Sequence, residues 1–179
     1  MITAAKDYRI SSTDNFFFDN NIWIFLFAPI GGFAKAKQND YANFLDYVVE
    51  RKRPIYINSL IVSEYVNACL RAEYEIWKKK EANLYNNGYK LHFLKTETYL
   101  NAKDSTLSSL KNILALTTKG NDNFNAINLP LVFNEMESCD FNDSYYLQYA
   151  QLGKYIIVTD DGDLFRNNKS GISIITFRP

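Results

Sequence analysis

The sequence predicts an α/β protein in which short buried strands alternate with helices. Its 179 residues suit one domain, and 47% of them are hydrophobic, so the chain can fill an interior. Apolar runs at residues 16–18, 55–57 and 155–158 are typical of strands buried on both faces, and helical patterns separate them. Because parallel strands need crossover helices, this alternation favours a mainly parallel sheet covered on both faces. We expect a single domain over residues 1–179, with a helical elaboration around 83–128.

Each element has a local signal. The strand at 16–18 ends at Asp19, and Asn20 and Asn21 are good caps for a short, almost wholly buried helix over 22–28. Later helices show apolar residues three or four positions apart, and later strands are short apolar runs. In chain order we expect a helix at 40–52, a strand at 55–57, helices at about 60–83, 96–118 and 141–153, and strands at 155–158 and 172–177.

Charge is balanced over the whole chain but segregated along it. Lys and Arg number 20, as do Asp and Glu, so net charge gives no general attraction to nucleic acid or acidic lipid. Residues 121–163 nevertheless carry eight acids against one base, whereas residues 71–119 carry nine bases against five acids. Any binding to a polyanion must therefore use local patches.

The sequence has few soft metal ligands. Cys69, Cys139 and His92 are its only cysteines and histidine, too few for the usual zinc site, so a metal would be held by oxygen. One disulfide is conceivable, but two thiols within apolar or helical patterns indicate small buried hydrophobes in a reducing compartment, and we expect a cytoplasmic protein. The longest apolar run, residues 22–30, has nine residues, short of the ~20 of a membrane helix, so we expect no membrane span.

Several carboxylates are expected where the strands end. The functional crevice of an open parallel sheet lies beyond the carboxyl ends of its strands. Asp19 closes the first strand, an acidic run of Asp160, Asp161 and Asp163 follows residues 155–158, and Asp143 opens the preceding helix. Convergent carboxylates repel one another unless a cation lies among them, which predicts Mg²⁺ or Mn²⁺ and, in turn, a phosphate-bearing substrate.

A purely structural interpretation competes with this one. Asp19 and Asp143 have the residue type of ordinary helix caps, and the run from Asp160 to Asp163 that of an ordinary turn. Glu64 fits this interpretation less well, because it lies early on a mostly apolar helix, where an inward carboxylate needs a partner.

Four segments together resemble PIN-domain nucleases, of the kind found as the toxin of toxin–antitoxin pairs. The segments are FFFDNNIW, INSLIVSEYVN, DFNDSYYLQYA and YIIVTDDGDLF. Their order and spacing match the family over about residues 16–165, most of the chain. Each motif is weak alone, and their succession in the expected elements carries the resemblance.

The resemblance implies a three-layer α/β/α fold with a parallel sheet of about five strands, and metal-dependent endonucleolytic cleavage, usually of RNA. It implies an acidic quartet that binds one or two Mg²⁺ or Mn²⁺ ions. The quartet would be Asp19, Glu64, Asp143 and Asp161. Asp163 would be an accessory metal-binding acid, and Thr159 would support the site from the strand end.

The chain departs from the family pattern in three ways. It is longer than the small toxins, with the surplus at residues 29–38 and 83–128. Asp160 competes with Asp161 for the fourth place in the quartet. The candidates for gripping RNA are local patches, at residues 51–53 and 78–80, for which a solvated face is the competing explanation. The sequence leaves open whether an antitoxin or a second copy of the chain is a partner.

Single features of the sequence bear on other possible functions. A PIN-like module that binds RNA or protein without cleaving is the main alternative, but retention of all four acids favours an enzyme. A haloacid-dehalogenase-like phosphatase needs a second Asp two residues after the first, and that position is Asn21. Neither phosphate-binding glycine fingerprint of nucleotide-binding proteins occurs.

Overall fold

One all-parallel sheet organises the described chain, which comprises residues 2–30, 35–80, 88–166 and 171–178 of a computed structural model. The sheet has six strands in the order β1-β6-β5-β2-β3-β4. The strands are β1 (Ile2–Ala4), β2 (Phe16–Phe18), β3 (Ile55–Ile57), β4 (Thr118–Lys119), β5 (Ile156–Val158) and β6 (Ile174–Thr176). The α-helices of the described residues are α1 (Asn20–Phe27), α2 (Lys35–Glu50), α3 (Ser59–Lys80), α4 (Gly88–Leu91), α5 (Glu97–Leu116), α6 (Leu129–Glu135), α7 (Phe141–Gly153) and α8 (Gly162–Arg166).

Helices lie on both faces of the sheet, so the fold is a three-layer α/β/α arrangement and the predicted class is confirmed. Alternation along β2 decides which helix each side chain meets. Phe17 packs on one face against Tyr146 and Tyr149 of α7, with both ring centroids 5.2 Å away. Phe16 and Phe18 point to the other face, toward Phe44 of α2. The ring centroid of Phe44 lies 6.0 Å from that of Phe16 and 6.3 Å from that of Phe18.

Most predicted elements form where the sequence places them. The strands at 16–18 and 55–57 and the helix at 141–153 are confirmed to the residue, whereas α2 begins five residues before the expected 40. Two strands were not expected, because β1 lies in a polar segment and β4 has only two residues, both exposed. The sheet therefore has six strands rather than about five. Residues 31–34 and 81–87, within the surplus segments, lie outside the described residues.

The strand order reverses between β2 and β5. From β2 the chain moves outward through β3 to β4, and it then returns to place β5 on the other side of β2. Phe18 pairs with Val158 at the last residue of each strand, so the segments after these strands leave the sheet side by side. Such a switch point at the carboxyl ends is where ligands bind in open α/β sheets.

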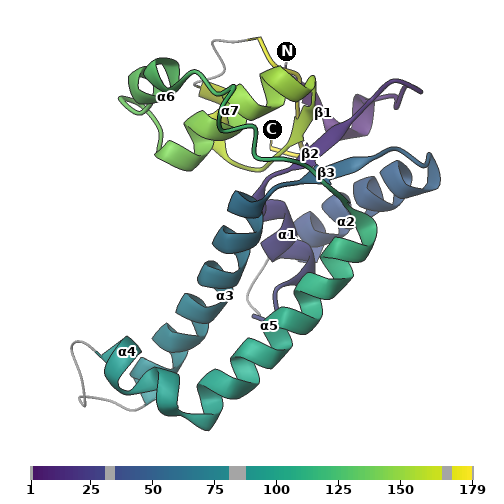
Figure 1. The fold of residues 1–179 in the computed structure, drawn as a ribbon. Coiled ribbons are helices and arrows are strands. Elements are labelled where there is room, and N and C mark those ends of the chain that lie inside the picture. Colours follow the sequence, from purple (N-terminus) through teal and green to yellow (C-terminus); the bar gives the residue numbers. More distant parts are fainter. Residues whose placement is uncertain (1, 31–34, 81–87, 167–170, 179) are drawn as a thin grey trace.

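Helices α3 and α5 pack along one another and project from the sheet as an arm, with α4 near its far end (Figure 1). A hydrogen bond of 2.7 Å between the hydroxyls of Tyr65 and Ser109 joins the two helices. The arm accounts for much of the predicted elaboration around 83–128.

Within the described residues, no helix is both long and apolar enough to cross a bilayer. Cys69 is buried and Cys139 is partly exposed, and neither forms a disulfide.

The central position of β2 predicts a large loss of stability when Phe17 is truncated. Phe17 is fully buried between two tyrosine rings, so Phe17→Ala should lower the free energy of unfolding by about 3–5 kcal/mol. Phe133→Ala makes the same chemical change at a side chain that is 57% exposed, and should change it by less than ~0.5 kcal/mol. Urea unfolding measures both, and equal losses would contradict this account of the core.

Candidate functional site

Asp19 is buried at the carboxyl end of β2, with 5% of its surface exposed. Its Oδ1 accepts a hydrogen bond of 2.6 Å from the backbone N–H of Asn20, so Asp19 is the N-cap of α1. Its other oxygen, Oδ2, accepts from the Thr159 hydroxyl at 2.6 Å and from the Asn21 amide at 2.8 Å. The capping interpretation and the site interpretation of Asp19 therefore both hold, each through a different oxygen.

The hydroxyl of Thr159 ties the ends of β2 and β5 together. It donates to Asp19 and accepts from the backbone N–H of Asp161, at 2.9 Å, and from the Asn21 amide, at 3.1 Å. The Asn21 carbonyl also accepts from the backbone N–H of Asp160, at 3.3 Å. Thr159 thus connects Asp19 to the backbone of Asp161, and its role in supporting a functional site stays a prediction. The contacts of Asn21 were missed, although its place two residues after Asp19 is a usable signal.

Asp160 and Asp161 have different environments. Asp160 is held by α2, because Lys37 forms an ion pair with its Oδ2 and the Tyr41 hydroxyl donates to its Oδ1 at 2.9 Å. Asp161 instead contributes to the rise in the pKa values of Asp19 and Asp143. Because Asp160 is already engaged with α2, its contacts favour Asp161 as the fourth acid.

Glu64 has the partner that its position on an apolar helix requires. It projects from α3 toward α7, where the Tyr146 hydroxyl donates to its Oε2 at 2.6 Å. Burial raises the pKa of Glu64, the hydrogen bond from Tyr146 opposes the rise, and the charge of Asp140 adds to it. Tyr146 lies three residues after Asp143, on the same side of α7, so its hydroxyl links Glu64 to the helix that carries Asp143.

Asp143 lies in the first turn of α7, and Asp140 rather than Asp143 caps that helix. The Oδ1 atom of Asp140 accepts from the backbone N–H of Asp143 at 2.9 Å, which leaves the Asp143 side chain free of the capping role. Burial, followed by the charges of Asp19, Asp140, Asp161 and Glu64, raises the pKa of Asp143 to about 8.

The four predicted acids are therefore close enough to act on one another. Burial is the largest cause that raises the pKa of Asp19 to about 7, and the charges of Glu64 and Asp161 add to it, whereas the Thr159 hydrogen bond opposes it. Carboxyl groups with such pKa values gain or lose protons near neutral pH, and strongly shifted groups in a crevice are typical of functional sites.

A cation is compatible with this arrangement, although the acids do not already form a set of ligands. Among the described residues, no three His, Cys, Asp or Glu side chains are grouped closely enough to hold an ion as they stand. Asn20, beside Glu64, has a fully buried Oδ1 without a hydrogen-bond partner. A buried acceptor without a donor is costly, and a hard cation prefers such oxygens, so the chemistry of the donors fits Mg²⁺ or Mn²⁺.

The contacts of Asp163 differ from those of the four acids of the quartet. Its backbone N–H donates to Oδ1 of Asp161 at 2.7 Å, and its side chain forms an ion pair with Arg166 of α8. Its role as an accessory metal-binding acid stays a prediction.

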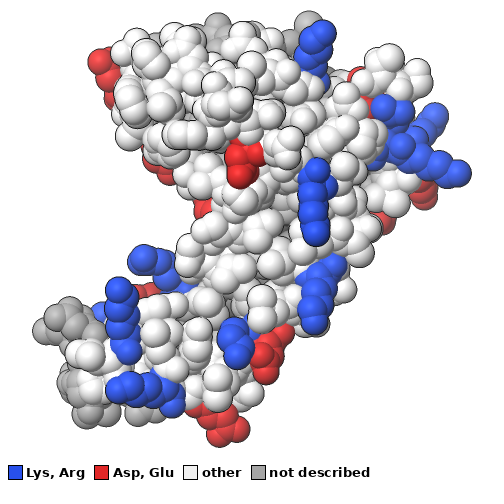
Figure 2. All heavy atoms as spheres, viewed as in Figure 1, with Lys and Arg blue, Asp and Glu red and all other residues white. Residues whose placement is uncertain are grey.

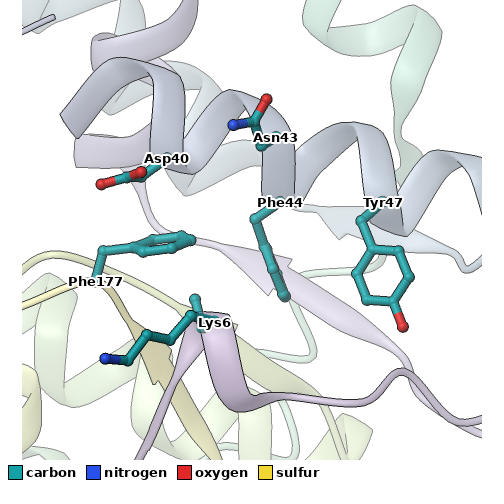
Figure 3. Close-up of a pocket in the computed structure, with 7 residues that line it drawn as sticks. Lys6, Asp40, Asn43, Phe44, Tyr47 and Phe177 are labelled. Carbon is teal, nitrogen blue, oxygen red and sulfur yellow. The ribbon is translucent and has the colours of Figure 1, made fainter. Parts of the chain in front are cut away.

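A separate pocket lies between α2 and the N-terminal segment (Figure 3). Phe44 and Phe177 line it, together with one cation, Lys6, and one carboxylate, Asp40. None of the four acids reaches it, so it does not belong to the carboxylate site.

Comparisons with known proteins leave the function open. No family model matches the sequence, and no curated protein matches it. Among solved structures, the crystal structure of PAE2754 from Pyrobaculum aerophilum is similar, with a TM-score of 0.48 and 16% sequence identity over 92% of this chain and 84% of that one. A likeness of this degree carries no argument about activity.

The raised pKa of Asp143 predicts a specific pH dependence of stability without metal. Because the folded state binds this proton more tightly than the unfolded state, the contribution of Asp143 is neutral below about pH 4 and becomes destabilising as the pH rises toward about 8. Asp143→Asn should therefore raise the melting temperature at pH 8 in EDTA and leave it nearly unchanged at pH 4. Thermal melts across this range test it, and destabilisation at pH 8 would favour a purely structural role.

The Tyr146 hydroxyl is predicted to position Glu64 for cation binding. Tyr146→Phe removes the hydroxyl and keeps the ring on Phe17, so it should raise the Mn²⁺ concentration needed to stabilise the protein in thermal melts. Tyr149→Phe is the matched control, because Tyr149 packs on the same ring from the next turn of α7, with its hydroxyl beside the Gly120 backbone. An equal Mn²⁺ response in both variants would contradict a role for the Tyr146 hydroxyl.

Proposed function

We propose that the protein is a metal-dependent endoribonuclease of the PIN-domain kind. The observation that carries the proposal is the hydrogen-bonded connection of Asp19, Thr159 and Asp161 at the switch point of the sheet, with burial and like charges raising the pKa values of Asp19 and Asp143. Buried like charges destabilise a folded protein, so their concentration at the carboxyl ends of the strands suggests a ligand that neutralises them. A divalent cation with a phosphodiester substrate is the chemistry that such a group of oxygens serves.

The residues around the site have different roles in this proposal. Asp19 and Asp161 are tied to each other through Thr159, and Glu64 is tied to α7 through Tyr146. In this proposal the quartet holds Mg²⁺ or Mn²⁺, and the side-chain Oδ1 of Asn20 is a further oxygen ligand. The bound ion would lower the pKa of a water ligand and stabilise negative charge on the phosphate.

RNA binding would rely on the arm rather than on residues 51–53. Those residues precede β3, and the backbone N–H of Phe16, at the start of β2, donates to Pro54, so they lie at the amino-terminal edge of the sheet, opposite the acids. Arg53 also donates to the Asp14 carbonyl at 2.9 Å. Helix α3 starts at the carboxyl-terminal edge and carries both Glu64 and residues 78–80, which favours the second patch.

The same proposal places the protein in the cytoplasm, where two unpaired thiols stay reduced. A toxin role would require an antitoxin protein as partner, and a small DNA-binding protein encoded by the neighbouring gene would support it. A homodimer is compatible with the same site, and size-exclusion chromatography tests for it.

RNA binding without cleavage is the second candidate. It is favoured by the absence, among the described residues, of a ready set of metal ligands. A phosphatase of the haloacid-dehalogenase kind is disfavoured further, because the amide of Asn21 is hydrogen-bonded to Asp19 and Thr159 and cannot act as its acid/base.

Cleavage assays with two neighbouring variants test the proposal. Purified protein should cleave single-stranded RNA with Mn²⁺ or Mg²⁺, and EDTA should stop it. Asp161→Asn should lower the rate by about 100-fold or more. Asp160→Asn removes the charge that pairs with Lys37 on α2, so it should lower the melting temperature and largely spare cleavage.

The outcomes separate the candidates. RNA binding with no cleavage at any metal concentration would favour the non-catalytic module. Cleavage that survives Asp161→Asn but not Asp160→Asn would mean that the wrong acid has been assigned to the site.

A further inference from the structure

The far end of the arm has a small aromatic core of its own, separate from the one beneath the sheet. Phe93 is fully buried there, and its ring centroid lies 5.5–5.6 Å from those of four other aromatic side chains. These are Tyr74 and Trp77 of α3, Tyr89 of α4 and Tyr99 of α5. The contacts hold the ends of the two long helices together.

The rings around Phe93 are only partly covered. Tyr74, Trp77, Tyr89 and Tyr99 all retain exposed surface. Partly exposed aromatic rings are the kind of surface on which unpaired bases stack.

Lysines are frequent in the segments that carry this aromatic cluster. The described residues from Tyr74 to Tyr99 include five lysines and two acids, Glu75 and Glu97. The lysines are Lys78, Lys79, Lys80, Lys90 and Lys95. Among the described residues none of them forms an ion pair, and Nζ of Lys78 lies 5.9 Å from the centroid of the Tyr74 ring. Figure 2 shows basic side chains over the region where Figure 1 places the arm.

The cluster is separated from the carboxylates by the length of α3. Glu64 and Lys78 are fourteen residues apart on one helix, which is about 21 Å at 1.5 Å per residue. Fourteen residues are close to four full turns, so the two side chains lie on nearly the same side of α3. A ligand that touches both must be extended and several nucleotides long.

We propose that the end of the arm, formed by these lysines and partly exposed rings, is a binding site for single-stranded RNA. The inference rests on the proposed nuclease function and adds to it a second contact that anchors the substrate about 20 Å from the acids. The lysines neutralise phosphates and the rings stack on bases, a combination typical of binding to single strands. A duplex does not fit as well, because its bases are already stacked and paired.

Binding of fluorescein-labelled single-stranded RNA, measured by anisotropy in EDTA, tests the proposal without cleavage. The triple variant Lys78→Glu, Lys79→Glu, Lys80→Glu should bind at least about tenfold more weakly, and the slope of log affinity against log salt should fall by about 2. The control Lys6→Glu, Arg9→Glu, Arg51→Glu makes the same charge change away from the arm, at the β1 edge and the amino-terminal end of the sheet, and should bind like wild type. Equal affinity of wild type and the Lys78–Lys80 variant, with circular dichroism showing both folded, overturns the proposal.

The two tryptophans supply an independent readout of stacking. Trp23 is fully buried, whereas Trp77 is partly exposed at the end of the arm, so stacking of a base should quench the fluorescence of Trp77 alone. Trp77→Phe keeps an aromatic ring beside Phe93 and should abolish the quench. Tight binding with no quench in wild type would overturn the stacking part of the proposal.

These results stand apart from those of the cleavage assay. RNA binding at the arm without cleavage would contradict the nuclease function and support the binding site. Cleavage together with unchanged binding by the Lys78–Lys80 variant would support the nuclease function and contradict the binding site.

Discussion

The parallel pairing of β2 with β5 is the constraint on which the rest of the site depends. Three fully buried residues of β2 pair with three buried residues of β5, and both strands end at the same level. The residues that follow, Asp19 and Thr159, therefore emerge side by side although 140 positions separate them in the chain. The Thr159 hydroxyl, with one proton and two acceptor sites, uses all of them, on Asp19, Asn21 and the Asp161 backbone. A slip of one residue between the strands would break this connection at once.

This connection brings together carboxylates whose burial is unfavourable. Hydrogen bonds from Thr159 and Tyr146 offset part of the cost for Asp19 and Glu64, whereas burial and charge repulsion dominate at Asp143. On the α2 side of the same strand end, Asp160 forms an ion pair with Lys37, which helps to hold α2 on the sheet. The two adjacent aspartates, Asp160 and Asp161, thus have different neighbours. In the proposed function, a cation from solution would offset the repulsion within the quartet.

Much of the fold follows from local patterns in the sequence, and much of the site from strand ends. Phe16–Phe18 and its successor Asp19 could be predicted because an apolar run and a following acid are both local signals. Asp160 and Asp161 have different neighbours, as alternation along an extended strand end requires. The sequence could not show that Tyr146 would meet Glu64, since that contact depends on how α3 and α7 approach each other across the sheet. β4 could not be predicted because its two residues are too few to form a pattern. The arm could not be predicted because its packing joins helices across a segment of weak periodicity.

The acidic and basic stretches of the sequence lie in different parts of the structure. The acid-rich stretch from 121 to 163 contains α6 and α7 and reaches the end of β5, whereas most bases of residues 71–119 lie on the arm. A group of acids repels a polyanion, so the proposed nuclease needs its basic surface outside the acidic site. Helix α3 connects the two regions, because Glu64 lies near its start and Lys78–Lys80 lie at its end, on the arm. In the proposed function these two stretches of opposite charge would have separate tasks, one to hold the cation and the other to hold the RNA strand.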